Sequence, residues 1–188
     1  MDQNQIQGSN LKVLLISGAL LILVALILAW VAVSWVGEGI SSGRQTSSEA
    51  TENTENVAVD RVIDGDTIVL NDGRRVRYIG INTPELGSGD KKGQCFSLEA
   101  KAANEKLVMG KKIRLEKDMS GRDKYGRLLR YVYVEDEDGQ EVFVNDYLVS
   151  QGYAKFLSIP PDIKFEGKFV GSADEAKFQN RGLWAACN

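Results

Sequence analysis

The longest feature of the hydrophobic pattern is an uncharged apolar run at residues 13–36. A helix of that length would measure about 36 Å, more than the roughly 30 Å hydrocarbon layer of a bilayer. Trp30 and Trp35 stand near its C-terminal end, where interfacial aromatic residues are expected. The run therefore predicts one transmembrane anchor. A cleaved signal peptide is the alternative, because Ala32-Val33-Ser34 is a tolerable cleavage site, although the run is longer than a usual signal.

A polar stretch separates the apolar run from the rest of the chain. Residues 37–56 are rich in Ser, Thr, Gly and Glu and almost lack large apolar side chains, which is typical of a flexible tether. We therefore expect a short N-terminal tail at 1–12, the anchor at 13–36, the tether at 37–56 and one folded domain at 57–188. A domain of about 130 residues is long enough to bury one sizeable core.

Beyond Val57 the pattern becomes β-branched and alternating, and it predicts five strands. They are VAVDRVI (57–63), TIVL (67–70), RRVRYIGI (74–81), KIRLE (112–116) and RLLRYVYV (127–134). Amphipathic stretches at 97–109, 145–152 and 172–181 predict three helices, with Asn145 as the candidate cap of the second. Five strands with a helix after the third indicate an α+β, mainly β domain. We expect a five-stranded Greek-key barrel of the oligonucleotide-binding (OB) type with three helices, preceded by the transmembrane helix.

The charge of the chain changes this picture little, but its lack of histidine is informative. The net charge is -3, and the first 56 residues hold five acidic and two basic side chains, so the folded domain is neutral. Any attraction for nucleic acid must then come from locally clustered basic groups. Without histidine, the chain cannot use an imidazole base, nucleophile or metal ligand. Hydrolytic chemistry would have to use carboxylates, arginine, lysine, tyrosine and an oxygen-bound metal.

Three short segments concentrate the unusual polar residues: VIDGDT (62–67), RYIGINTPE (77–85) and DKYGR (123–127). Each one alone is most simply a turn or a helix start. Together they suit phosphodiester hydrolysis, which needs phosphate charge neutralised and a water positioned and deprotonated. Arg77 and Arg127 are candidates for gripping the phosphate with planar donor forks, and Glu85 is the candidate base. The side chains of Asp66 and Asn82 and a carbonyl near Thr83 offer oxygen ligands for a hard cation.

These segments, followed by V-N-x-x-L-V-x-Q-G-x-A-K at 144–155, resemble the staphylococcal nuclease (thermonuclease) family in order and spacing, over the whole of 57–188. The resemblance implies an OB barrel, one calcium ion, and cleavage of DNA and RNA that leaves 3′-phosphate ends. It assigns calcium to Asp66 and the Thr83 carbonyl, the phosphate to Arg77 and Arg127, and the general base to Glu85. Lys124 and Tyr125 then lie near the neighbouring substrate phosphate.

Two departures from the family pattern affect the expected site. Asn82 stands where an aspartate would bind calcium, and an amide oxygen coordinates calcium without adding charge. We therefore expect weaker calcium binding, or a greater need for the substrate phosphate. Ser158 and Pro160 stand where two tyrosines would flank the nucleotide. Aromatic stacking is worth about 1–3 kcal/mol per base, so base preference is expected to differ.

The two cysteines bear on the compartment in which the domain works. Cys95 precedes the first predicted helix and Cys187 is the penultimate residue. They are either two free thiols or a disulfide that pins the C-terminal tail, and a disulfide would favour an oxidising compartment. Flanking charges barely distinguish the two topologies, with Lys12 on one side and Arg44 on the other. The cysteines favour a single-pass protein whose domain lies outside the cytoplasm; secretion after signal cleavage is the alternative.

We thus expect a monomeric, calcium-dependent nuclease that acts on DNA and RNA, preferably single-stranded or locally opened, and that binds the membrane through residues 13–36. One alternative is a catalytically weakened OB module that binds nucleic acid or protein at the membrane. Another is a calcium-stabilised structural protein of the cell surface. A degenerate copy usually loses its arginines or its glutamate, whereas Arg77, Glu85 and Arg127 all remain.

Overall fold

The computed structural model describes residues 54–187. The expected N-terminal tail at 1–12, the anchor at 13–36 and nearly all of the tether at 37–56 lie outside the described residues. Within 54–187, no helix combines the length and the apolar character needed to cross a bilayer.

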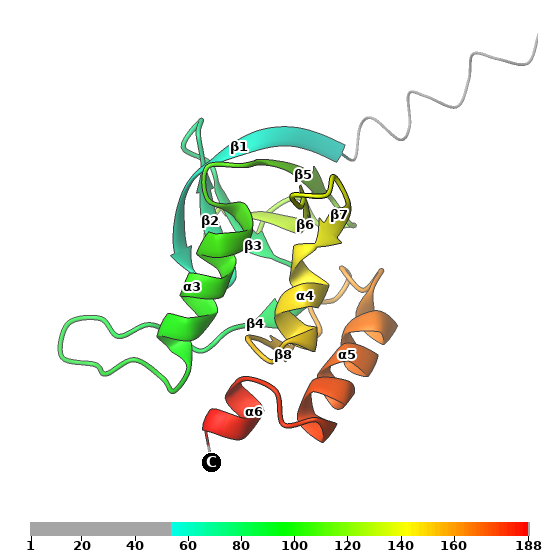
Figure 1. Ribbon diagram of the computed structural model, residues 1–188. Helices are drawn as coiled ribbons and strands as arrows, with labels where there is room; N and C mark the ends of the chain where they lie inside the picture. The colour runs from blue at the N-terminus through cyan, green and yellow to red at the C-terminus, as the bar shows by residue number, and fades with distance from the viewer. Residues whose placement is uncertain (1–53, 188) are drawn as a thin grey trace, which may run out of the picture. The chain divides into compact units, whose positions relative to one another are not determined.

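Five strands form a closed barrel, which confirms the predicted five-stranded barrel (Figure 1). Neighbours pair antiparallel in the order β3-β2-β1-β5-β6, and a parallel pairing of β3 with β6 closes the ring. The strands are β1 (Thr54–Asp64), β2 (Thr67–Leu70), β3 (Arg75–Tyr78), β5 (Lys112–Glu116) and β6 (Leu128–Glu135). Their inward residues, such as Ile68, Val76 and Leu115, are fully buried and form the core. In β5 the period-two alternation of the sequence is the alternation between barrel interior and exterior, whereas β2 is buried along its whole length.

The strand boundaries differ from the prediction at two places. β1 begins at Thr54, so the last three residues of the expected tether pair with the end of β5. The predicted third strand is divided into β3 and β4 (Ile81–Asn82) at Gly80. Gly80 has φ of +80°, and a Cβ there would collide with the buried Phe169 ring. Only glycine permits both the backbone conformation and the close approach. β4 can then leave the barrel and pair with β8 (Lys155–Phe156).

Four helices accompany the barrel: α3 (Ser97–Val108), α4 (Val144–Ser150), α5 (Glu166–Phe178) and α6 (Leu183–Ala186). The first two were predicted nearly at these bounds; the third was predicted at 172–181, which overlaps α5 but misses its start, and the short α6 was not predicted. α5 begins six residues earlier, because burial of Phe169 in an aromatic cluster with Tyr131 and Phe143 fixes its first turns. α4 packs against α3, α5 and β6. A short strand, β7 (Glu141–Phe143), pairs antiparallel with β6 before α4 begins.

Asn145 is not a helix cap, contrary to the prediction. It lies inside the first turn of α4 and is fully buried. Its Oδ1 accepts a hydrogen bond of 2.9 Å from the Val132 amide, and its Nδ2 donates one of 2.9 Å to the Ile79 carbonyl. The side chain thereby satisfies the hydrogen-bonding needs of two backbone groups at the point where β3 and β6 separate. These groups would be costly to bury without a partner. Asn145 links α4 to the place where the barrel closes.

Candidate active site

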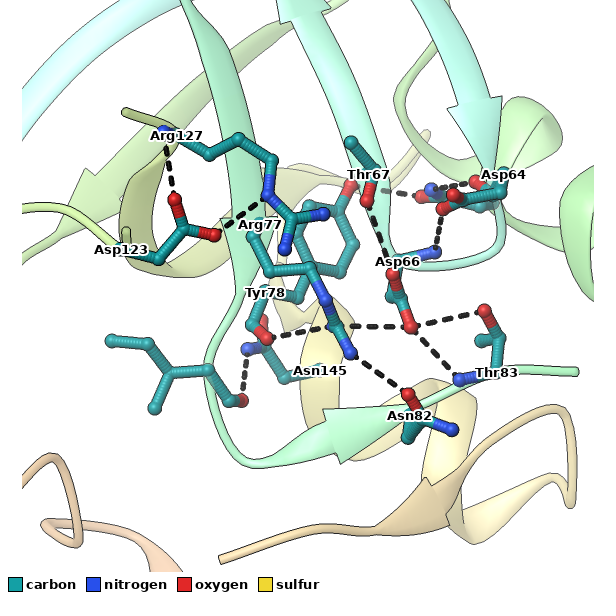
Figure 2. A network of polar contacts seen from close by, with 12 residues as sticks. Asp64, Asp66, Thr67, Arg77, Tyr78, Asn82, Thr83, Asp123, Arg127 and Asn145 are labelled. Carbon is teal, nitrogen blue, oxygen red and sulfur yellow. Dashed lines mark hydrogen bonds and ion pairs between the residues drawn. The ribbon is translucent and has the colours of Figure 1, made fainter. Parts of the chain in front are cut away.

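The turn between β1 and β2 presents a buried carboxylate at one end of the barrel (Figure 2). Asp64 Oδ1 accepts a hydrogen bond of 3.0 Å from the Asp66 amide and so shapes the turn. A Cβ at Gly65 would lie 2.6 Å from Thr83 Cγ2, so glycine lets the turn approach Thr83. Asp66 Oδ2 accepts hydrogen bonds from the Thr83 amide (2.8 Å) and hydroxyl (3.0 Å). Two motifs far apart in the sequence are joined by this contact.

Arg77 joins the same network from β3. Its side chain is buried, with Nη1 3.0 Å from Asp66 Oδ2 and also donating to the Tyr78 carbonyl at 3.0 Å. Nη2 donates to Asn82 Oδ1 at 3.0 Å. One guanidinium thus bridges the carboxylate and the amide that were predicted to bind a cation. The structure therefore places Asp66, Arg77, Asn82 and Thr83 together in one network.

The environment of Asp66 makes its negative charge costly. Asp66 is only 5% exposed. Burial raises its pKa, and the ion pair with Arg77 only partly opposes this, while the nearby Asp64 carboxylate raises it further. The net result is a pKa of about 6, against 3.8 for an ordinary aspartate. A cation bound beside this carboxylate would relieve that cost.

The raised pKa predicts how stability depends on pH when no metal is bound. The folded state binds the Asp66 proton more tightly than the unfolded state, so the carboxyl adds no cost below about pH 4. Its cost grows as the pH rises towards about 6 and stays constant above. Asp66→Asn lacks this ionisation. Between pH 4 and pH 7 its free energy of unfolding should therefore rise relative to that of wild type, by up to about 3 kcal/mol. Urea unfolding in the presence of a chelator measures the difference; a pH-independent difference would contradict the prediction.

Arg127 lies at the turn that precedes β6 and is held by Asp123. Arg127 Nε donates to Asp123 Oδ2 at 2.7 Å, and the amides of Arg127 and Tyr125 donate to Asp123 Oδ1 at 3.0 and 2.9 Å. Burial tends to raise the pKa of Asp123, but these hydrogen bonds outweigh it and keep the pKa below its ordinary value. Asp123 was not among the predicted site residues, although it is the first residue of the DKYGR segment. Asp123 fixes the turn and orients the arginine.

A cleft of about 420 Å³ brings the basic candidates together. Arg77, Lys124, Tyr125 and Arg127 line it, and apolar residues of the β8–α5 connection, Pro160 among them, form another wall. Tyr125 is 71% exposed, with Lys124 Nζ 5.1 Å and Arg127 Cζ 5.5 Å from the centre of its ring. The ring and two cations thus stand side by side at the mouth of the cleft. Ser158 is exposed on the same connection and is not one of the lining residues.

Glu85 is less closely integrated than the other predicted residues. It lies in the loop after β4, two residues beyond Thr83, and its side chain is exposed. The side chain is not part of the Asp66–Arg77 network, nor does it line the 420 Å³ cleft. Only its main chain is fixed, by hydrogen bonds to Gln94.

The available oxygen donors suit a hard cation. Within residues 54–187, no three His, Cys, Asp or Glu side chains are grouped as a metal site. The Asp66 carboxylate and the Asn82 amide oxygen nonetheless lie in one network, in which the Thr83 amide donates to Asp66, and hard cations prefer such oxygen ligands. This donor set carries a single negative charge, and Arg77 already engages two of its oxygens. It fits calcium chemically and favours modest affinity.

Cys95 and Cys187 form a disulfide, with their Cα atoms 5.8 Å apart. The bond joins the loop before α3 to the residue that follows α6. Of the two arrangements that the sequence left open, the structure therefore has the disulfide.

Comparison with known proteins agrees with this geometry. A family profile described as "Staphylococcal nuclease homologue" matches residues 75–186. Endonuclease YncB of Bacillus subtilis (strain 168) is 37% identical over 134 residues, which cover 69% of this chain and 62% of that protein. The thermonuclease of Staphylococcus hyicus is 33% identical over 141 residues, covering 73% of this chain and 79% of that protein. The thermonuclease of Staphylococcus intermedius is 35% identical over 133 residues, covering 69% and 76%.

Proposed function

Because the chain belongs to the staphylococcal nuclease family of phosphodiester hydrolases, we propose that it is a calcium-dependent nuclease that cleaves DNA and RNA and leaves 3′-phosphate ends. The observation that carries the proposal is the shared cleft, in which Arg77 and Arg127 stand with Lys124 and Tyr125. Two guanidinium groups beside a buried carboxylate suit a phosphodiester, whose charge increases in the transition state. The neutral domain needs such local clustering to attract a polyanion.

Each residue of the cleft has a task in this proposal. Arg77 and Arg127 donate hydrogen bonds to the oxygens of the scissile phosphate, and Asp123 keeps the Arg127 fork in place. Tyr125 offers its exposed ring and Lys124 its charge to the neighbouring nucleotide. Pro160 lines the cleft where a stacking tyrosine is absent, so base discrimination there rests on shape alone.

Glu85 is the proposed general base. A carboxylate on the exposed loop beyond Thr83 can accept a proton from an attacking water. The water oxygen then bonds to phosphorus, the bond from phosphorus to the 5′-oxygen breaks, and the 5′-oxygen leaves as a hydroxyl after taking a proton from solvent. The phosphate stays on the 3′-oxygen of the other product. Because Glu85 is exposed in the free protein, its alignment is completed when substrate binds.

Calcium would be held by Asp66, Asn82 and the Thr83 carbonyl. When bound, it would add positive charge beside the phosphate and lower the cost of ionised Asp66. We expect Asn82→Asp to tighten calcium binding about ten-fold, because a second carboxylate adds charge to the donor set. Calorimetry of wild type and variant without substrate tests this, and equal affinities would remove Asn82 from the proposed ligand set.

A nuclease assay on single-stranded DNA and RNA, with calcium, with magnesium or with chelator, tests the function. Wild type should cut only with calcium, and Glu85→Gln should lower kcat about 100-fold because the base is lost. The matched control is Glu99→Gln, an exposed glutamate of α3. Equal cutting by wild type and Glu85→Gln would dismiss Glu85 as the base. No cutting by wild type under any condition would favour a binding module.

The location of the enzyme is part of the proposal. We place the domain outside the cytoplasm on a membrane anchor at residues 13–36, supported by the apolar run and by the disulfide. In untreated cells the protein should be found in the membrane fraction. Protease added to intact cells should remove the domain. Full protection of the domain from protease in intact cells would contradict this placement.

A further inference from the structure

The loop between β4 and α3 carries the proposed base, and one side chain in it holds the backbone of that base. The Glu85 amide donates to Gln94 Oε1 at 2.9 Å, and the Gln94 amide donates to the Glu85 carbonyl at 2.9 Å. Gln94 therefore grips both main-chain polar groups of one residue. Two residues earlier, Thr83 is held by Asp66 through its amide and hydroxyl. With Pro84 between them, the segment from Thr83 to Glu85 is fixed at both ends.

Gln94 is in turn fixed by its neighbour in the chain. Cys95 is disulfide-bonded to Cys187, which directly follows α6. α6 is anchored to the folded body, since the Leu183 amide donates to the Gly152 carbonyl at 2.8 Å and Arg181 Nη1 donates to the Ser150 carbonyl at 2.9 Å. A Cβ at Gly152 would collide with the Arg181 carbonyl, so the two segments are in close backbone contact. The disulfide thus ties an otherwise exposed loop to a rigid anchor.

The disulfide also forms part of the wall of a second cavity, of about 230 Å³, that reaches the cation ligands. Asn82 and Thr83 line this cavity together with Gln94 and both cysteines. The oxidised pair therefore lies across one small space from the residues proposed to bind calcium. Breaking the bond would release both Gln94 and this wall.

We infer that Gln94 is a positioning residue for Glu85 and that the Cys95–Cys187 disulfide holds Gln94 in place, so that full activity requires the oxidised protein. The inference rests on the proposed function, because it assigns Gln94 a purpose through Glu85. Reduction of the disulfide by a dithiol, which is itself oxidised to a disulfide, leaves the arginines and the cleft intact. It frees the loop to move Glu85 away from the attacking water, and small displacements of a reacting group are costly in rate.

The test is steady-state kinetics of the full-length protein at saturating calcium. Gln94→Met is nearly isosteric but cannot accept the Glu85 hydrogen bond, and it should lower kcat about ten-fold with KM within about two-fold. Gln94→Glu keeps an acceptor oxygen and should recover most of the loss. Gln140→Met, at an exposed glutamine of the turn between β6 and β7, is the matched control and should behave as wild type.

The role of the disulfide is tested by combining variants. Cys95→Ala with Cys187→Ala should lower kcat about ten-fold, but less than about two-fold further in a Gln94→Met background, because both changes act through one contact. Circular dichroism at the assay temperature ensures that folded protein is compared. Wild-type kcat in Gln94→Met, or fully additive losses, would overturn the inference. If Glu85→Gln itself retained wild-type kcat, the proposed role of Glu85 as base would fail instead, and if wild type did not cut nucleic acid at all, the proposed function would fail.

Discussion

Arg127→Ala is expected to lower kcat on single-stranded DNA by about 10³-fold or more. The guanidinium lies in the cleft with Arg77, and its loss leaves the developing charge on the phosphate with one donor fork instead of two. Arginines placed against a phosphoryl transition state contribute about 10³–10⁵ in rate. Steady-state kinetics at saturating calcium, with KM and kcat separated, measures the loss.

Three further variants show whether geometry or charge accounts for the effect. Arg127→Lys keeps the charge but lacks the planar fork, so it should recover only a small part of the rate. Asp123→Asn weakens the 2.7 Å contact that orients Arg127 and should give an intermediate loss. Arg61→Ala, at an exposed arginine of β1, is the matched control and should retain wild-type kcat. A loss of less than about ten-fold in Arg127→Ala would show that the phosphate is gripped elsewhere.

Replacing both cysteines by alanine is expected to lower the free energy of unfolding by about 4–5 kcal/mol. The bond closes a loop between residues 92 positions apart, and such a constraint removes much of the conformational freedom of the unfolded chain. The disulfide acts mainly on the unfolded state. Its removal should therefore lower the free energy of unfolding by more than the deletion of an exposed contact does. Urea unfolding followed by circular dichroism measures it.

Chemical reduction provides the control for this second prediction. Wild type in excess dithiol should unfold at the same urea concentration as the alanine variant, and the variant should not respond to dithiol. If reduced and oxidised wild type unfolded at the same midpoint, the disulfide would contribute nothing to stability. A change in the slope of the transition would instead indicate altered compactness of the unfolded state.

The barrel was predictable because each of its strands carries its own signal. The β-branched and aromatic residues of β1, β2, β5 and β6 signal strands locally, although of these four strands only β5 alternates regularly in burial. β4, β7 and β8 are two or three residues long, too short for a period-two pattern to show. The start of α5 depends on Phe169 packing against Gly80, a contact between residues far apart in the sequence. The local pattern of hydrophobic and polar residues cannot predict such a contact.

Residue types suggested the site, but its connections required coordinates. Asp66, Arg77, Asn82 and Thr83 converge as expected, yet nothing in the sequence indicates that one guanidinium bridges the Asp66 carboxylate and the Asn82 amide. Asn145 was mistaken for a cap because asparagine before a helix usually is one, and its two backbone partners come from β6 and the end of β3. Glu85 remains a prediction about a complex, since its carboxylate is exposed in the free protein.

The parallel pairing of β3 with β6 has a consequence for how the chain comes to be active. Val76 pairs with Leu128 and Arg77 with Leu129, so Arg77 of β3 and Arg127, which directly precedes β6, come together where these two strands close the ring. Contacts so distant along the chain form slowly, because the entropy cost of closing a long loop must be met before the contacts can stabilise the fold. A newly made or unfolded polypeptide would therefore have no assembled pair of guanidinium groups. Any activity that needs both arginines would then appear only once the ring has closed.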